Sequence, residues 1–220
     1  MAAKKKTIRT IPQARTPVRE QDPKVRARNF EEVSLGYSLD EALVEADRCL
    51  QCADEPCVRG CPVGIDIPGF IQKIVEKHHH GAYDIITDTN LLPSVCGRVC
   101  PQEEQCEASC VLAKKGEAVA IGRLERFLGD TDLACEIDKR CVPEVAAPSG
   151  FRCAVVGSGP AGLACAGELA RLGHAATVFE SLHAPGGVLT YGIPEFRLPM
   201  DIVSAEIEML STVGVEIVTD

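Results

Sequence analysis

Eight of the chain's 12 cysteines lie in two short clusters, and these clusters limit what the chain can fold into. The first reads Cys-x2-Cys-x4-Cys-x3-Cys-Pro from Cys49, and the second reads Cys-x3-Cys-Pro-x4-Cys-x3-Cys from Cys96. No apolar segment follows Met1 to indicate export to an oxidising compartment, so disulfides are the least favoured explanation. Structural zinc sites favour two short pairs of ligands, whereas a run of four cysteines ending in Cys-Pro is typical of [4Fe–4S] proteins. The spacing therefore favours iron–sulfur clusters over zinc.

The charge is distributed unevenly along the chain. Residues 1–28 carry nine Lys and Arg against two acidic residues, while the remainder carries 14 basic and 30 acidic residues. The acidic body argues against a nucleic acid as the partner. Residues 1–30 predict an extended basic arm, for which packing on a partner protein is favoured over contact with RNA. No apolar run approaches the roughly 20 residues that span a bilayer, and the need for reduced thiols predicts a cytoplasmic protein.

Residues 31–130 predict a small helical domain wrapped around metal. Ser38 and Glu41 form a capping box that begins the first helix. The apolar face of that helix predicts that Cys49 and Cys52 lie at its C-terminal end. Asp66 caps a second helix, which the sequence predicts to end at Gly81.

Three adjacent histidines, at positions 78–80, end this predicted second helix. Successive helical residues point in different directions, so we interpret them as favourable charges at a helix C-terminus rather than as metal ligands. Pro93 begins a short helical piece with Cys96 and Cys100, and a last helix is predicted over residues 117–128. Residues 131–150 read as a linker, in which Cys135 and Cys141 lack further ligands and are predicted to be free thiols.

The pattern changes at residue 151, where an α/β unit is predicted to begin. A short apolar strand is followed by G-x-G-x-x-G, a helix, and a second strand that ends on Glu180. In this motif Gly157 allows a tight turn, Gly159 lets the backbone approach a pyrophosphate, and Gly162 permits close packing of helix on strand. The pyrophosphate would rest on the helix N-terminus, and Glu180 would accept hydrogen bonds from the adenosine ribose. Two further cysteines of this unit are predicted to pack in its core, namely Cys153 and Cys165.

Four segments carry a family resemblance: residues 48–52, 60–63, 96–101 and 186–199. They read RCLQC, GCPV, CGRVCP and GGVLTYGIPEFRLP. The chain from about Asp22 resembles the small (beta) subunit family of NADPH-dependent glutamate synthase. The same pattern is shared with the N-terminal half of dihydropyrimidine dehydrogenase and with the large subunit of the electron-bifurcating NADH-dependent ferredoxin:NADP oxidoreductase. The implied fold is an α-helical domain binding two [4Fe–4S] clusters, followed by a Rossmann-like α/β domain that forms part of an FAD-binding site.

The resemblance implies how the clusters and the flavin are held. One cluster would be bound by Cys49, Cys52, Cys57 and Cys110. The second would be bound by Cys61, Cys100 and Cys106, with Glu125 as a non-cysteine fourth ligand, which leaves Cys96 unbound. The implied FAD-contacting positions are Gly157, Ser158, Gly159, Pro160, Ala161, Gly162, Glu180, Gly187, Val188 and Arg197.

The implied function is that of an electron-transfer oxidoreductase subunit, with no residue acting as an acid or a base. Electrons would pass between NAD(P)H, FAD and a larger partner subunit, glutamate synthase being favoured over the two other family members. Members of this family are roughly twice as long, so we expect a fragment or one half of a split protein, inactive alone. Its FAD site would be incomplete, and a further chain could supply the missing NADPH-binding half. A non-enzymatic iron–sulfur adaptor is the alternative of another class.

Overall fold

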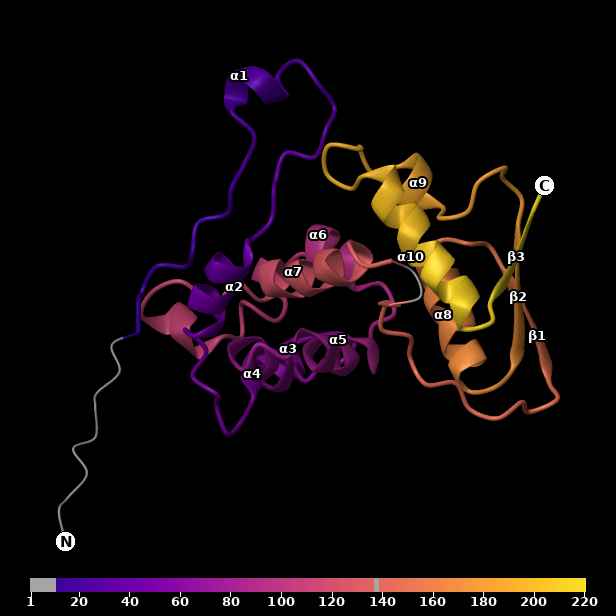
Figure 1. The fold of residues 1–220 in the computed structure, drawn as a ribbon, viewed down its shortest axis with the longest axis horizontal. Coiled ribbons are helices and arrows are strands. Elements are labelled where there is room, and N and C mark those ends of the chain that lie inside the picture. Colours follow the sequence, from indigo (N-terminus) through magenta and orange to yellow (C-terminus); the bar gives the residue numbers. More distant parts are fainter. Residues whose placement is uncertain (1–10, 137–138) are drawn as a thin grey trace, which may run out of the picture.

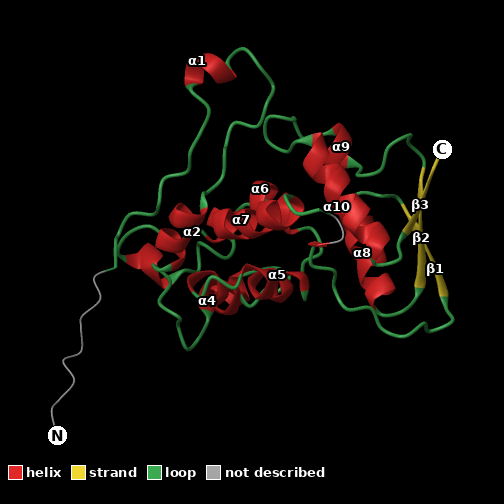
Figure 2. Ribbon diagram, viewed as in Figure 1, coloured by secondary structure: helices red, strands yellow, loops and turns green. Residues whose placement is uncertain are grey.

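The computed structural model describes residues 11–136 and 139–220, which form a helical unit followed by a parallel α/β unit (Figures 1 and 2). The predicted fold class is therefore confirmed, whereas the first ten residues of the predicted basic arm lie outside the described residues. No helix in the described part of the chain is long and apolar enough to cross a membrane. The first unit contains α1 (Pro23–Arg26), α2 (Leu39–Ala46), α3 (Pro56–Gly60), α4 (Ile67–Val75), α5 (His79–Thr87), α6 (Pro93–Val99), the 3-10 turns η1 (Gln102–Glu104) and η2 (Val111–Lys114), and α7 (Ile121–Leu133).

The α/β unit has three parallel strands in the order β1-β2-β3. Its elements are β1 (Arg152–Val156), α8 (Pro160–Arg171), β2 (Ala175–Glu180), α9 (Val188–Tyr191), α10 (Met200–Thr212) and β3 (Glu216–Thr219). Helix α8 packs on β1 and β2, and α10 packs on α8, so these helices lie between the sheet and the helical unit (Figure 1). The sheet leaves apolar side chains exposed, among them Val156 at 89% and Phe179 at 47%.

Two helix starts match their sequence signals. Ser38 accepts a hydrogen bond from the backbone of Glu41, and the Glu41 carboxylate accepts one from the backbone of Ser38 at 2.6 Å, which completes the predicted capping box. Asp66 accepts a hydrogen bond from the Gly69 backbone at 2.9 Å and caps α4 as expected.

The predicted end of the second helix is wrong. Helix α4 ends at Val75, and His79 and His80 instead begin α5, a helix that the sequence reading did not separate. Lys77 adopts the left-handed conformation with a φ of 58°, and the backbones of Lys77 and His78 donate to the carbonyls of Ile74 and Lys73. This pattern is a Schellman motif, which usually has glycine at the left-handed position. Because a lysine occupies it here, the sequence carried no visible stop signal.

The last helix of the first unit also differs from its predicted bounds. Helix α7 begins at Ile121 rather than at residue 117, and it continues to Leu133 into the predicted linker. Most of its residues are buried, including Leu124 and Leu128, because it packs against α6, α5 and α2. Tertiary packing therefore extends this helix beyond its local sequence signals.

The helical and α/β units share a core rather than only a linker. Leu92 and Val95, at the start of α6, belong to the same buried cluster as the side chains of α8, α10 and the strands. Glu206 of α10 is 1% exposed, and its carboxylate accepts a hydrogen bond from the backbone of Ser94 at 2.6 Å. Burial raises the pKa of Glu206 to about 7, and nearby Asp132 adds to this effect. Helix α6 is thus held against the α/β unit by both apolar and polar contacts.

Candidate iron–sulfur and nucleotide sites

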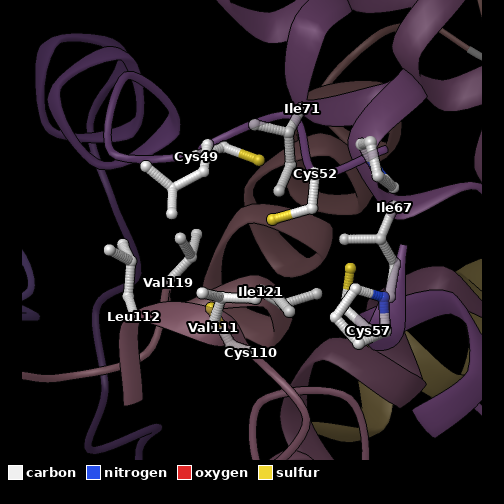
Figure 3. A pocket seen from close by; sticks show the side chains of 13 residues that line it. Cys49, Cys52, Cys57, Ile67, Ile71, Cys110, Val111, Leu112, Val119 and Ile121 are labelled. Atoms are coloured by element: carbon white, nitrogen blue, oxygen red, sulfur yellow. The ribbon is translucent and has the colours of Figure 1, made fainter. Parts of the chain in front are cut away.

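Four cysteines that the resemblance implied for one cluster line a single pocket (Figure 3). Cys49 follows α2, Cys52 and Cys57 flank the turn into α3, and Cys110 precedes η2. The pocket is otherwise lined by apolar side chains, namely Leu50, Pro56, Ile67, Pro68, Ile71, Val111, Leu112, Val119 and Ile121. Two segments that are far apart in the sequence, residues 49–57 and the segment at Cys110, therefore bring four sulfur atoms to one apolar pocket.

The chemistry of this pocket fits a [4Fe–4S] cluster. Burial, followed by the nearby Cys49, raises the pKa of Cys57 to about 11, and burial likewise raises the pKa of Cys52. An apolar pocket disfavours isolated thiolates, whereas metal ligation stabilises the deprotonated form of each cysteine. Four cysteines are also the usual ligand set of such a cluster. The assignment of Cys49, Cys52, Cys57 and Cys110 as ligands remains a prediction.

The turn that carries these cysteines has an unusual backbone. Gln51 and Glu55 have positive φ values of 50° and 42°, which non-glycine residues rarely adopt. The Gln51 side chain donates a hydrogen bond to the Pro68 carbonyl at 3.0 Å and lies 3.6 Å from the sulfur of Cys49. Gln51 therefore ties the cysteine turn to α4, a role that the sequence reading did not identify.

A second group brings together Cys61, Cys100, Cys106 and Glu125. Burial raises the pKa of Cys106, and the nearby charges of Glu107, Glu125 and Cys61 raise it further, in that order. Burial also raises the pKa of Glu125 to about 8, with nearby Cys100 adding to the effect. Three thiols and one buried carboxyl group fit a cluster with one oxygen ligand, and their role as ligands likewise remains a prediction.

Asn90 is a polar residue of this second group that sequence reasoning missed. Its side chain is 8% exposed and donates a hydrogen bond to the Glu125 carboxylate at 2.7 Å. It also accepts hydrogen bonds from the Leu92 backbone and from the sulfur of Cys96. An asparagine that precedes a proline-initiated helix reads only as a turn residue, so no sequence signal distinguished it.

A buried ion pair stands directly before the first predicted ligand. Arg48 is 1% exposed and donates to the carboxylate of Glu45 at 2.6 Å, and Glu45 is fully buried. Arg48 also donates to four backbone carbonyls, those of Pro12, Gln13, Glu117 and Ala118. The pair therefore joins the N-terminal arm, α2 and the segment before α7 next to Cys49.

The two cysteines of the predicted linker lie against the helical unit. The sulfur of Cys141 is 2.9 Å from Nδ1 of His80, and the backbone of Cys141 donates to Asp132. The sulfur of Cys135 contacts the Thr131 carbonyl. Both remain predicted free thiols.

The predicted phosphate-binding turn has the expected backbone. Gly157 has a φ of 92°, which favours glycine, and Gly159 is the N-cap of α8. A Cβ atom on Gly162 would lie 2.0 Å from the Gly157 carbonyl oxygen, whereas a Cβ atom on Gly159 would meet nothing within 4 Å. Gly162 therefore permits the packing of α8 on β1, and the open side of Gly159 leaves room for a ligand.

Glu180 and Ser158 tie the end of β2 to this turn. The Glu180 carboxylate accepts hydrogen bonds from both the backbone and the hydroxyl group of Ser158. These bonds lower the pKa of Glu180 to about 2, so the carboxylate is ionised at neutral pH. The Ser158 hydroxyl also accepts a hydrogen bond from the Gly186 backbone at 3.0 Å. The acidic residue predicted to bind ribose is thus held beside the turn.

The remaining predicted flavin-contacting residues divide between two places. A Cβ atom on Gly187 would lie 2.8 Å from Cα of Gly159, so the loop that carries Gly187 packs directly on the glycine turn. Val188 begins α9, and its side chain is 56% exposed. Arg197 lies elsewhere and lines a cavity of about 540 Å³ between the N-terminal arm, α6 and α7. The segment that follows the arm contacts the loop before α10 through a hydrogen bond from the Val33 backbone to the Phe196 carbonyl at 3.0 Å.

We expect Gly159→Ala and Gly162→Ala to have different effects. Gly162→Ala should lower the free energy of unfolding by about 1–3 kcal/mol, because the new methyl group overlaps a backbone oxygen. Gly159→Ala should cost less than about 1 kcal/mol, since the space is open and only the N-cap preference changes. It should nevertheless weaken FAD binding. Thermal unfolding and fluorescence titration with FAD measure the two effects, and equal destabilisation by both substitutions would contradict this reading of the turn.

Comparison with known proteins places both units among characterised sequences. Residues 26–137 match the family described as dihydropyrimidine dehydrogenase domain II, 4Fe-4S cluster, and residues 155–201 match the NAD(P)-binding Rossmann-like domain. The glutamate synthase [NADPH] small chain of Escherichia coli K12 is 39% identical over 193 residues, which cover 88% of this chain and 40% of that protein. The NAD-dependent dihydropyrimidine dehydrogenase subunit PreT of Salmonella typhimurium LT2 is 35% identical over 188 residues, which cover 86% of this chain and 45% of that protein.

A third relative, the putative oxidoreductase UacF of Escherichia coli K12, is 38% identical over 192 residues, which cover 87% of this chain and 30% of that protein. The chain thus spans less than half the length of each of these three relatives.

Proposed function

Because the chain belongs to the dihydropyrimidine dehydrogenase domain II, 4Fe-4S cluster family, we propose that it is the electron-transfer module of an NAD(P)H-dependent flavin and iron–sulfur oxidoreductase. The observation that carries this proposal is the four-cysteine pocket of Cys49, Cys52, Cys57 and Cys110, which shares one folded chain with a nucleotide-binding turn. The two units share a buried core, so a nucleotide and a cluster would be held at a constant separation.

The residues of this chain would bind and orient cofactors rather than take part in acid–base chemistry. FAD, when bound, would supply the exchange between a two-electron hydride and single electrons, and the clusters would carry single electrons. The glycine turn and Glu180 would bind the adenine end of the dinucleotide. The two cysteine groups would hold two clusters, with Glu125 as the oxygen ligand of the second.

The arrangement of α6 supports an order for the transfer. Cys100 follows α6 directly, and α6 packs on α10 of the α/β unit. The pocket of the first group is lined by side chains of the helical core, including Ile67, Ile71 and Ile121, and no described residue of the α/β unit lines it. Since Cys100 is the predicted ligand that adjoins this contact, the proposed order is flavin, second cluster, first cluster, partner.

The identities of the relatives suggest two candidate partners. The match to a glutamate synthase small chain favours a larger glutamate synthase subunit as the acceptor. The matches to the dihydropyrimidine dehydrogenase family and to PreT favour a pyrimidine-reducing subunit as the second candidate. Copurification of the native complex, followed by mass spectrometry of the larger chain, distinguishes them.

Anaerobically purified protein is expected to be brown and to contain about eight irons and eight sulfides per chain, because two [4Fe–4S] clusters are proposed. Dithionite should bleach the visible absorption, and air or a dye should restore it. Iron and sulfide analysis measures the cluster content, and EPR spectroscopy of the reduced protein tests for two clusters. A colourless protein that retains tightly bound zinc would refute the proposed function.

A further inference from the structure

Cys96 lies within the second group, although the family resemblance leaves it unbound. Cys96 lies on α6 and Cys100 is the C-cap of that helix, and the Cys100 backbone donates a hydrogen bond to the Cys96 carbonyl at 3.1 Å. The thiol of Cys96 donates to the amide oxygen of Asn90, whose amide nitrogen donates to the Glu125 carboxylate. Cys96 therefore lies beside Cys100 and is linked through Asn90 to Glu125, two of the four side chains predicted to bind the second cluster.

Asn90 contacts both of the side chains that compete for the fourth place. Its amide nitrogen donates to Oε1 of Glu125 at 2.7 Å, and its amide oxygen lies 3.5 Å from the sulfur of Cys96. One amide group therefore orients the carboxylate and also accepts the hydrogen bond of the neighbouring thiol. The shorter of the two bonds is the one to Glu125, which favours Glu125 as the ligand and leaves Cys96 as its neighbour on the same amide group.

We propose that Cys96 is a reserve ligand of the second cluster, which takes the fourth coordination position when Glu125 is displaced or removed. This inference rests on the proposed function, since it requires a cluster at the second group. On displacement of Glu125 an iron–oxygen bond would break, an iron–sulfur bond would form, and the proton of the Cys96 thiol would pass to the departing carboxylate. In Glu125→Ala the proton would pass to water when the thiolate binds. No electron is gained or lost. Replacement of an oxygen ligand by a thiolate would change the reduction potential of the cluster.

Four variants of the full chain test the reserve ligand when they are purified anaerobically. Cys96→Ser should keep about eight irons per chain, because Glu125 remains. Glu125→Ala should also keep about eight, because Cys96 takes its place. Glu125→Ala combined with Cys96→Ser should fall to about four. The matched control combines Glu125→Ala with Cys153→Ser, which changes a cysteine of β1 instead, and it should keep about eight.

A spectroscopic signature makes the test independent of how well the double variant folds. In ⁵⁷Fe Mössbauer spectra the wild-type chain should show one iron with an oxygen ligand, and Glu125→Ala should lose that component at unchanged total iron. The EPR signal of the first cluster reports whether each variant is folded.

The reserve ligand would be overturned if Glu125→Ala alone lost about four irons. It would also be overturned if the double variant with Cys96→Ser still contained about eight irons. A wild-type chain without the second cluster would instead overturn the proposed function.

Discussion

Cys57→Ser is expected to halve the iron content of the anaerobically purified chain, from about eight to about four irons. Cys57 lines the apolar pocket with Cys49, Cys52 and Cys110, and its burial raises the pKa of its thiol to about 11. A serine hydroxyl group gives up its proton far less readily than a thiol, so it would not replace a thiolate ligand in this pocket. The cluster would then have only three of its four ligands.

The control for this prediction is Cys165→Ser. Cys165 lies exposed on α8, so the prediction that it packs in the core is wrong. Its substitution should leave about eight irons per chain. Because metal binding also contributes to folding, Cys57→Ser should lower the melting temperature as well, while Cys165→Ser should not. Equal iron contents in the two variants would show that Cys57 is not a ligand.

Among single substitutions of residues that are not predicted ligands, Arg48→Met is expected to cause the largest loss of stability. The substitution would leave the carboxylate of Glu45 buried without its cation, although the backbones of Thr16 and Ala120 still donate to it. Breaking a buried ion pair from one side costs about 3–5 kcal/mol. For a chain of this size that corresponds to a fall of about 10 °C in the melting temperature, measurable by anaerobic differential scanning calorimetry.

A matched substitution separates burial from charge. Arg59 forms an exposed ion pair with Asp54, in which the two side chains are 67% and 73% exposed. Arg59→Met should therefore change the free energy of unfolding by less than about 1 kcal/mol. A similarly small change in Arg48→Met would mean that the pair is solvated in solution and does not hold the arm against α2.

Local signals in the sequence predicted the elements whose causes are themselves local. The capping box of Ser38 and Glu41 and the cap of Asp66 each satisfy backbone groups within three residues, so they are readable without a structure. The glycine turn is equally local, because Gly157, Gly159 and Gly162 act within one strand–turn–helix unit. The fold class and the nucleotide turn therefore followed from the sequence alone.

Tertiary structure alone decided which side chains meet. Cys110 shares a pocket with Cys49, Cys52 and Cys57 although half of the helical unit separates them in the chain. Spacing shows that cysteines cluster, but it does not show which clusters fold onto one another, because that depends on the packing of α2, α4 and α7. The sharing of ligands had to come from a family resemblance for the same reason.

The polar partners of the two groups are also products of long-range packing. Asn90 reaches Glu125 across 35 residues, and Arg48 reaches the Ala118 carbonyl across 70. Each of these residues has an ordinary local context, and only burial makes its hydrogen bonds strong and its loss costly. The sequence by itself determined the turns, the helix caps and the side chains that are chemically able to bind metal or nucleotide. The tertiary structure decided which of these groups are buried together, because burial depends on the packing of distant segments.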